Sequence, residues 1–187
     1  MIFENLRLIG ERLNRDGILW AVGASVMLNQ YGLVDRPNDI DLMVDINDID
    51  KVDCILKELG NKKYREKVEE YATEYFYEYV INGSDVDVMA GLTINFCDGS
   101  YRYIFDKSSI ARIVDIDGVD IPLTSLEDWY VLYQVIPNRE KKVVMIENYL
   151  KDNGITRIDL LKRALTRELP IEVRERIEKL IESNYKC

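Results

Sequence analysis

The chain has 187 residues, 47% of them hydrophobic, which suits one medium domain with a real core. Its formal net charge is −9, which makes extensive nucleic-acid binding an unfavourable hypothesis, because phosphate binding needs a basic surface. It contains no histidine, which excludes histidine bases, Ser-His triads and histidine-bound metals. A bound metal would have oxygen ligands, which favour Mg²⁺ or Mn²⁺.

Neither a membrane span nor a secretory signal is expected. The longest apolar stretch, Ile18 to Leu28, is shorter than the about twenty residues that cross a bilayer. The first residues contain no basic segment of the signal-peptide type. The three cysteines form no Cys-x-x-Cys pair and predict neither a disulfide framework nor a zinc site. We therefore expect a cytoplasmic protein.

The first part of the chain alternates helical and strand patterns. Apolar residues at helical spacing over 3–13 predict a helix that Asp16-Gly17 ends. The apolar run 18–22 predicts a buried strand. A small-residue turn at 23–25 then leads into a brief helix that stops near Gly32.

A strand with two different faces is predicted from Asp39 to Asp45. Its even-numbered positions are apolar, and its aspartates at 39, 41 and 45 share the opposite face. Asn47 is expected to cap the next helix, which Gly60 ends. The apolar face of that helix consists of Ile49, Val52, Leu56 and Leu59.

Two β-hairpins are predicted from dipeptides that adopt the positive φ angles of a type I′ turn. The first joins 71–81 to 85–90 through Asn82-Gly83, and the second joins 110–116 to 119–123 through Asp117-Gly118. Strands interleaved with helices in this way imply an α+β fold, a mixed sheet flanked by helices.

After Leu123 only helices are predicted. Their expected starts are Thr124 with Glu127 as a capping box, Asn138, Thr156 with Asp159, and Pro170. Pro137-Asn138 ends the first of them. The last has one apolar stripe, made of Val173, Ile177, Leu180 and Ile181. We therefore divide the chain into an α/β domain at 1–123 and a C-terminal helical subdomain at 124–187.

Asp-Ile-Asp occurs three times, and only the first triplet, 39–41, predicts a site. Asp48 and Asp50 belong to the first turn of a helix, where negative side chains favour the macrodipole. Asp117 is explained by its Asp-Gly turn. Asp39 and Asp41 instead point the same way, with Cα atoms roughly 6.6 Å apart on a strand, and they repel each other unless a cation lies between them. The alternative interpretation is a strand with a solvated acidic face.

Two further features strengthen the metal hypothesis. The turn Gly23-Ala24-Ser25 exposes backbone N–H groups at a helix start, where phosphate oxygens bind, and Ser25 adds a hydroxyl. The alternative is an ordinary tight strand-to-helix connection. Asp87 lies among Val86, Val88 and Met89, so it is expected to point away from the core that they enter. Asp85 shares its face, but it adjoins a turn.

Together these residues resemble the nucleotidyltransferase superfamily of the DNA polymerase β type. Its pattern is a Gly-Gly or Gly-Ser turn, a gap of about a dozen residues, an Asp-x-Asp strand and a later acidic strand. Residues 125–128 followed by Arg139-Glu140-Lys141-Lys142 also look like the end of small bacterial and archaeal AbiEii-like members. Two departures are Ala24 in place of glycine, and Tyr133-Gln134-Val135 where many such members have a lysine.

The resemblance implies a two-metal site of Mg²⁺ or Mn²⁺. Asp39 and Asp41 would hold both ions, Asp87 would complete the acceptor-side ion, and the turn Gly23-Ala24-Ser25 would bind the nucleotide. Without histidine, the proton of the acceptor goes to Asp87 or to water. Arg36 either contacts phosphate or is a surface loop residue.

The leading hypothesis is an enzyme that moves an NMP group from an NTP to a hydroxyl on a protein, a tRNA or a small molecule such as an aminoglycoside. The alternative is a catalytically inactive domain of the same fold that binds a nucleotide or a partner protein, possibly in a toxin–antitoxin system. A third hypothesis is a structural α/β scaffold whose aspartate pair is only a solvated face.

Overall fold

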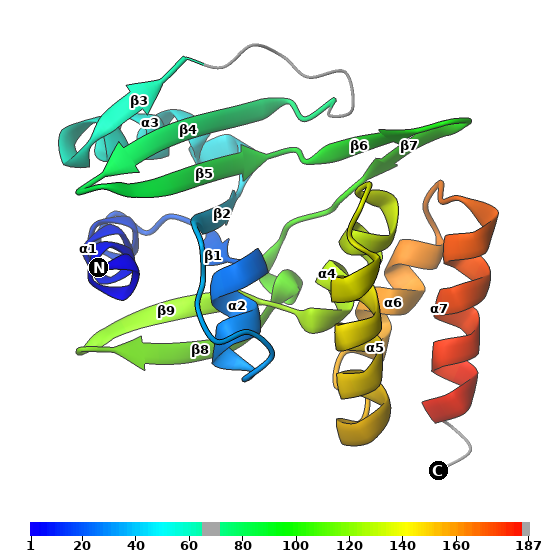
Figure 1. The fold of residues 1–187 in the computed structure, drawn as a ribbon. Coiled ribbons are helices and arrows are strands. Elements are labelled where there is room, and N and C mark those ends of the chain that lie inside the picture. The colour runs from blue at the N-terminus through cyan, green and yellow to red at the C-terminus, as the bar shows by residue number, and fades with distance from the viewer. Residues whose placement is uncertain (65–71, 185–187) are drawn as a thin grey trace.

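The computed structural model describes residues 1–64 and 72–184 and folds them around a mixed β-sheet (Figure 1). The sheet has seven strands in the order β3-β4-β5-β2-β1-β9-β8, and β6 and β7 form a separate hairpin. The strands are β1 (Trp20–Val22), β2 (Ile40–Val44), β3 (Asn61–Lys63), β4 (Tyr75–Ile81), β5 (Ser84–Ala90), β6 (Thr93–Phe96), β7 (Gly99–Arg102), β8 (Ile110–Ile116) and β9 (Val119–Thr124). This is the α+β architecture expected from the sequence.

Helices pack on the sheet and beside it. They are α1 (Ile2–Arg15), α2 (Ala24–Gln30), α3 (Ile49–Leu59), α4 (Leu126–Val135), α5 (Glu140–Asn153), α6 (Ile158–Leu165) and α7 (Ile171–Asn184), with 3₁₀ turns η1 (Ile46–Asp48) and η2 (Lys107–Ser109). Helix α1 packs closely on the sheet at Gly10, where an added Cβ would lie 2.4 Å from Ile121 Cδ1. The helices α4 to α7 gather beside the sheet (Figure 1). None of the described helices has both the length and the apolar character that crossing a bilayer requires.

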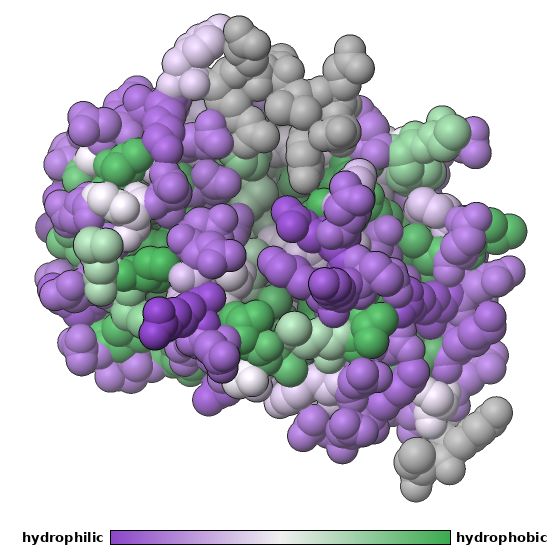
Figure 2. Space-filling view, viewed as in Figure 1, coloured by the Kyte–Doolittle hydropathy of each residue, from purple (hydrophilic) through white to green (hydrophobic). Residues whose placement is uncertain are grey.

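Hydrophilic side chains predominate on the face of the molecule shown in Figure 2, in keeping with the net charge of −9.

Both predicted hairpins are confirmed, together with their turn chemistry. Asn82 and Gly83 have φ angles of +46° and +80° between β4 and β5. Asp117 and Gly118 have φ angles of +49° and +82° between β8 and β9. The strand predicted over 71–81 begins at Tyr75, and Tyr71 lies outside the described residues.

Three strands were not predicted: β3 and β7 lack an alternating apolar pattern, and in β6 the alternation covers only four residues. All three residues of β3, Asn61–Lys63, are polar and exposed, and only pairing with β4 makes them a strand. The hairpin of β6 and β7 turns through Cys97-Asp98, which is not a type I′ dipeptide.

The predicted capping residues Asn47 and Thr124 were wrong. The 3₁₀ turn η1 precedes α3, and the Asp45 carboxylate accepts the Asn47 N–H, so Asn47 is a donor inside the turn. Helix α4 is capped by Ser125, whose hydroxyl accepts the Asp128 N–H at 2.9 Å. Thr124 Oγ1 accepts the Trp129 Nε1–H at 2.7 Å instead.

The predicted caps Asn138 and Thr156 were wrong as well, because α5 and α6 each begin one residue later, after Arg139 and Arg157. Helix α5 begins after Arg139, and Asn138 takes a φ of +62° ahead of it. Thr156 donates both its N–H and its hydroxyl to the buried Glu127 carboxylate, at 3.0 and 3.1 Å. Glu127 is therefore a long-range anchor for the start of α6 and not part of a capping box.

Arg163 on α6 joins the helices to the loop that precedes β8. Its guanidinium donates to the Ile104 carbonyl at 3.1 Å and to Ser109 Oγ at 3.0 Å. It also lies 3.7 Å from the buried Asp128 carboxylate. Residues on both sides of position 123 belong to the same hydrophobic core, and the division of the chain at that position stays a prediction.

Asp128 makes the stability of this junction depend on pH. Burial raises its pKa to about 6 and outweighs Arg163, Tyr103 and Ser125, which lower it. The folded state therefore keeps a proton on Asp128 that the unfolded state releases near pH 4. The contribution of this proton to the stability of the fold is complete below pH 4 and is lost as pH rises through about 6.

We therefore predict that Asp128→Asn changes the pH dependence of folding. Relative to the variant, the wild type should lose up to roughly 3 kcal/mol of unfolding free energy between pH 4 and pH 7. Urea denaturation at a series of pH values measures the difference between the two proteins. A difference that stays constant with pH would contradict the raised pKa.

Candidate active site

Asp41 and Asp87 lie directly opposite each other on neighbouring strands. The parallel strands β2 and β5 pair in a register that sets Asp41 against Asp87. The residues that flank them, Ile40, Leu42, Val86 and Val88, are completely buried. Since successive side chains of a strand alternate between faces, burial of these neighbours directs both carboxylates to the opposite face.

Asp39 joins them from the residue before β2, and all three aspartates line one cavity of about 290 Å³. The sequence predicted these three residues as a group, and the structure places them around one space.

Ser25 positions the start of the acidic strand. Its hydroxyl lies 3.1 Å from Asp39 Oδ1 and 3.2 Å from the Asp39 carbonyl, as a donor, and it accepts the Asn38 N–H at 3.2 Å. The side chain is buried. The predicted role of Ser25 was phosphate binding, and in this structure its hydroxyl ties helix α2 to Asp39.

Contacts with β2 and α4 determine which residue fits at Gly23, and backbone conformation does so at Ala24. The Gly23 N–H donates to the Asp41 carbonyl at 2.9 Å. A Cβ on Gly23 would lie 2.4 Å from Cζ2 of Trp129, so this position has no room for a side chain. Ala24 lines the cavity and has a φ of +43°, a conformation that favours glycine.

The basic residues that line the cavity come from the helical part of the chain. Arg139 and Lys142 line the cavity together with Trp129, Tyr133 and Ile136. The Lys142 ammonium donates to the Tyr133 hydroxyl at 3.2 Å. Sequence analysis noted Arg139 and Lys142 only as part of a family-like segment. Their spacing of three residues at a helix start was the available signal, because it puts both on one helix face.

The three carboxylates and Lys142 affect one another electrostatically. Burial and the charges of Asp39 and Asp87 raise the pKa of Asp41 well above its usual value, and Lys142 opposes this rise. Burial and the charge of Arg139 lower the pKa of Lys142, and Asp41 and Asp39 oppose that change. A cation bound between the aspartates would relieve the repulsion that raises the pKa of Asp41.

The donor chemistry fits a hard divalent cation, because every acidic lining residue offers carboxylate oxygens. Among residues 1–64 and 72–184, however, no three carboxylates or thiols are already gathered into a group that could hold one ion. The aspartates thus provide suitable ligands around a common space without forming a finished metal centre.

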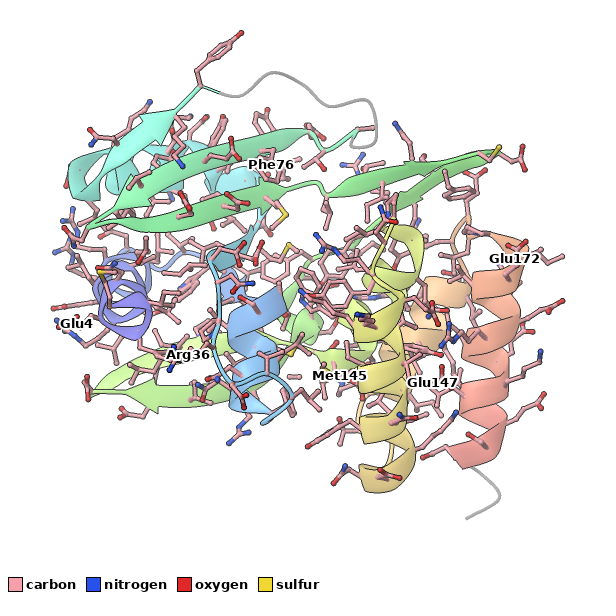
Figure 3. All side chains as sticks on the ribbon, in the orientation of Figure 1. Glu4, Arg36, Phe76, Met145, Glu147 and Glu172 are labelled. Atoms are coloured by element: carbon pink, nitrogen blue, oxygen red, sulfur yellow. The ribbon has the colours of Figure 1, made fainter. Side chains whose placement is uncertain are left out.

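Apolar side chains cover the side of the cavity next to Asp87. Met89 follows Asp87 on β5 by two residues, Phe76 pairs with Met89 from β4, and Leu92 lies beyond the end of β5. Figure 3 shows Phe76 on β4 and Arg36 on the segment before β2. Arg36 is exposed and is not among the residues that line the cavity.

The other two Asp-Ile-Asp triplets have structural roles outside the cavity. Asp48 accepts the Leu19 N–H at 3.2 Å, and Asp50 is exposed in the first turn of α3. Asp115 accepts the Gly118 N–H at 3.2 Å within the hairpin turn. Neither triplet contributes to the cavity.

Several solved structures described as nucleotidyltransferases share this fold. A Thermotoga maritima protein described as a putative nucleotidyltransferase is 28% identical, with 79% of this chain and 91% of that chain covered and a TM-score of 0.60. ANT(2")-Ia in complex with adenylyl-2"-tobramycin is 11% identical, with 94% of each chain covered and a TM-score of 0.53. The lincosamide antibiotic adenylyltransferase LnuA, bound to lincomycin, is 14% identical, with 77% of this chain and 95% of that chain covered and a TM-score of 0.52.

No protein-family model matches the sequence, and no curated protein matches it either. The similarity to solved structures supports the nucleotidyltransferase superfamily that the sequence predicted. The AbiEii-like subtype is a prediction that these structures do not address.

We predict that Ala24→Gly stabilises the protein. A positive φ costs an alanine about 1–2 kcal/mol, and glycine avoids this cost. Part of the gain is offset, because glycine also makes the unfolded chain more flexible. The free energy of unfolding in urea should rise by up to about 1 kcal/mol.

Ala21→Gly in β1 is the matched control for Ala24→Gly. Ala21 is completely buried and its φ is not positive, so this change should lower the free energy of unfolding by about 1 kcal/mol. If both substitutions destabilise to the same extent, Ala24 is not strained.

Proposed function

We propose that the protein is a metal-dependent nucleotidyltransferase that moves an NMP group from an NTP to a hydroxyl acceptor. The observation that carries the proposal is one cavity with aspartates on its sheet wall and Arg139 and Lys142 on its helical wall. The fold shared with nucleotidyltransferases supports this reaction class.

Asp39, Asp41 and Asp87 are the proposed ligands of two Mg²⁺ or Mn²⁺ ions. Such ions supply activation of the acceptor hydroxyl and neutralisation of charge on the leaving pyrophosphate. The protein contributes by fixing two of these carboxylates on paired strands, so that they need little reorganisation when the substrates arrive. Ser25 limits the freedom of Asp39 in the same way.

Arg139 and Lys142 are the proposed ligands of the triphosphate. Both line the cavity that the aspartates line, and their positive charges would neutralise phosphate charge there. The turn Gly23-Ala24-Ser25 would form the neighbouring nucleotide-binding wall, since Ala24 also lines the cavity. Many members of the family that the sequence resembles have a lysine where this chain has residues 133–135. Lys142 is proposed to supply the positive charge of that lysine.

The acceptor is proposed to enter beside Asp87. Phe76, Met89 and Leu92 make this side apolar, and Asp87 can take the proton of the acceptor hydroxyl as the bond to phosphorus forms. Two solved structures with the same fold hold adenylyl-2"-tobramycin and lincomycin. A small molecule is therefore the first acceptor class to test, ahead of a protein or a tRNA end.

The second candidate function is nucleotide or partner-protein binding without transfer, possibly in a toxin–antitoxin pair. Two observations favour it. Ala24 puts a methyl group in the lining of the cavity, at the turn where the superfamily has glycine. The described acidic residues also form no preassembled group for a metal.

We predict that Asp41→Asn abolishes label transfer from α-³²P-NTPs in Mg²⁺ or Mn²⁺, because the variant removes a proposed metal ligand. The assay uses tobramycin, lincomycin and cell extract as acceptor sources. A loss of a hundredfold or more is expected for a charged group of the transition-state site. Asp50→Asn is the matched control, since Asp50 belongs to an Asp-Ile-Asp triplet outside the cavity.

Three outcomes separate the hypotheses. Transfer by the wild type and Asp50→Asn, but not by Asp41→Asn, supports the enzyme. Thermal stabilisation by NTP and metal without transfer to any acceptor supports the binding domain. A wild type that neither binds nor is stabilised by NTP and metal would identify the aspartate pair as a solvated face of a scaffold.

A further inference from the structure

The cation of Lys142 lies in the same cavity as the carboxylates proposed to bind metal. Its side chain comes from α5 and is half-buried, and its ammonium donates a hydrogen bond to the Tyr133 hydroxyl. Within the described residues Lys142 makes no direct ion pair with an aspartate. It acts on Asp41 and Asp39 through the field in the cavity.

A half-buried cation facing acidic groups across a confined space partly neutralises them. The interaction is mutual, because the charge of Lys142 favours ionised Asp41 and the aspartates favour charged Lys142. Electrostatic interactions are stronger here than on the open surface, because the dielectric constant is lower. A divalent cation that binds to the aspartates therefore meets the positive charge of Lys142 in the same cavity.

The triphosphate of an NTP changes this balance. Its negative charge would draw the ammonium of Lys142, together with Arg139, toward the phosphates, and it would cancel the repulsion between Lys142 and the metal ions. Metal and nucleotide would then strengthen each other's binding, and by linkage each must do so by the same factor.

We propose that Lys142 makes metal binding depend on nucleotide. In the empty site its ammonium is the counter-ion of Asp39 and Asp41, and in the loaded site it binds the triphosphate. The inference rests on the proposed NTP and metal binding, and it does not require that transfer occurs. Its consequence is that the aspartates hold divalent ions weakly until an NTP arrives.

Lys142→Met tests this directly. We predict that the variant binds Mn²⁺ about tenfold more tightly than the wild type without nucleotide, a gain of the size that coupled sites show. The strengthening of Mn²⁺ binding by a non-hydrolysable NTP analogue should fall by the same factor. The concentration of free Mn²⁺ measured by electron paramagnetic resonance gives both values without turnover.

Three variants serve as controls. Lys141→Met removes a neighbouring charge from the exposed face of α5 and should leave Mn²⁺ affinity unchanged. Lys142→Arg keeps the positive charge and should resemble the wild type. Lys142→Gln replaces Lys142→Met if circular dichroism shows that the latter fails to fold.

Three results would overturn the proposal. The first is that Lys142→Met binds Mn²⁺ no more tightly than the wild type, and the second is that it does not bind Mn²⁺ at millimolar concentration. The third is that Lys141→Met gains as much Mn²⁺ affinity as Lys142→Met. If the wild type transfers label while Lys142→Met shows no gain, only this inference fails. If Mn²⁺ affinity rises but no acceptor is labelled, only the transferase proposal fails.

Discussion

The pairing of β2 with β5 is the constraint on which the site depends. These strands run parallel, although the two are not joined by a single crossover helix: α3, β3 and β4 lie between them in the chain. Their register brings Asp41 opposite Asp87, two carboxylates that are far apart in sequence. The apolar residues that alternate with the aspartates on both strands secure this register, because a shift of one residue would turn the acidic side chains into the core.

Close carboxylates are unfavourable for folding, and the surrounding structure compensates for them. Burial, followed by repulsion from Asp39 and Asp87, raises the pKa of Asp41, and Lys142 lowers the cost of keeping this carboxylate charged. The helical wall of the cavity is held by contacts outside it. Trp129 packs against Gly23 and donates to Thr124, and Glu127 and Arg163 join α4 and α6 to their neighbours. The helical part thus completes a site that the sheet alone would leave acidic.

The features that sequence analysis found are those set by local patterns. The alternation of polar and apolar residues revealed the aspartates of β2 and β5. The dipeptides Asn82-Gly83 and Asp117-Gly118 identified both hairpins. The capping predictions failed at Thr124 and Thr156 because buried side chains use those hydroxyls. The partner of Thr124 is Trp129, which lies on the next helix, and the partner of Thr156 is Glu127, which is distant in sequence. Lys142 was overlooked as a site residue for the same kind of reason. Its relation to Asp41 exists only after α5 docks beside the sheet.

The two walls of the cavity place different demands on sequence. The acidic wall needs fixed spacing, since a strand register determines which side chains meet, and Asp-x-Asp therefore persists as a recognisable motif. The basic wall needs only positive charge on one face of a helix, which lysine or arginine can supply from several positions. A lysine missing at 133–135 and a lysine present at 142 are compatible with the same electrostatic role. The geometry of the cavity is therefore a better guide to the proposed phosphate ligands than the position of a single basic residue in the sequence.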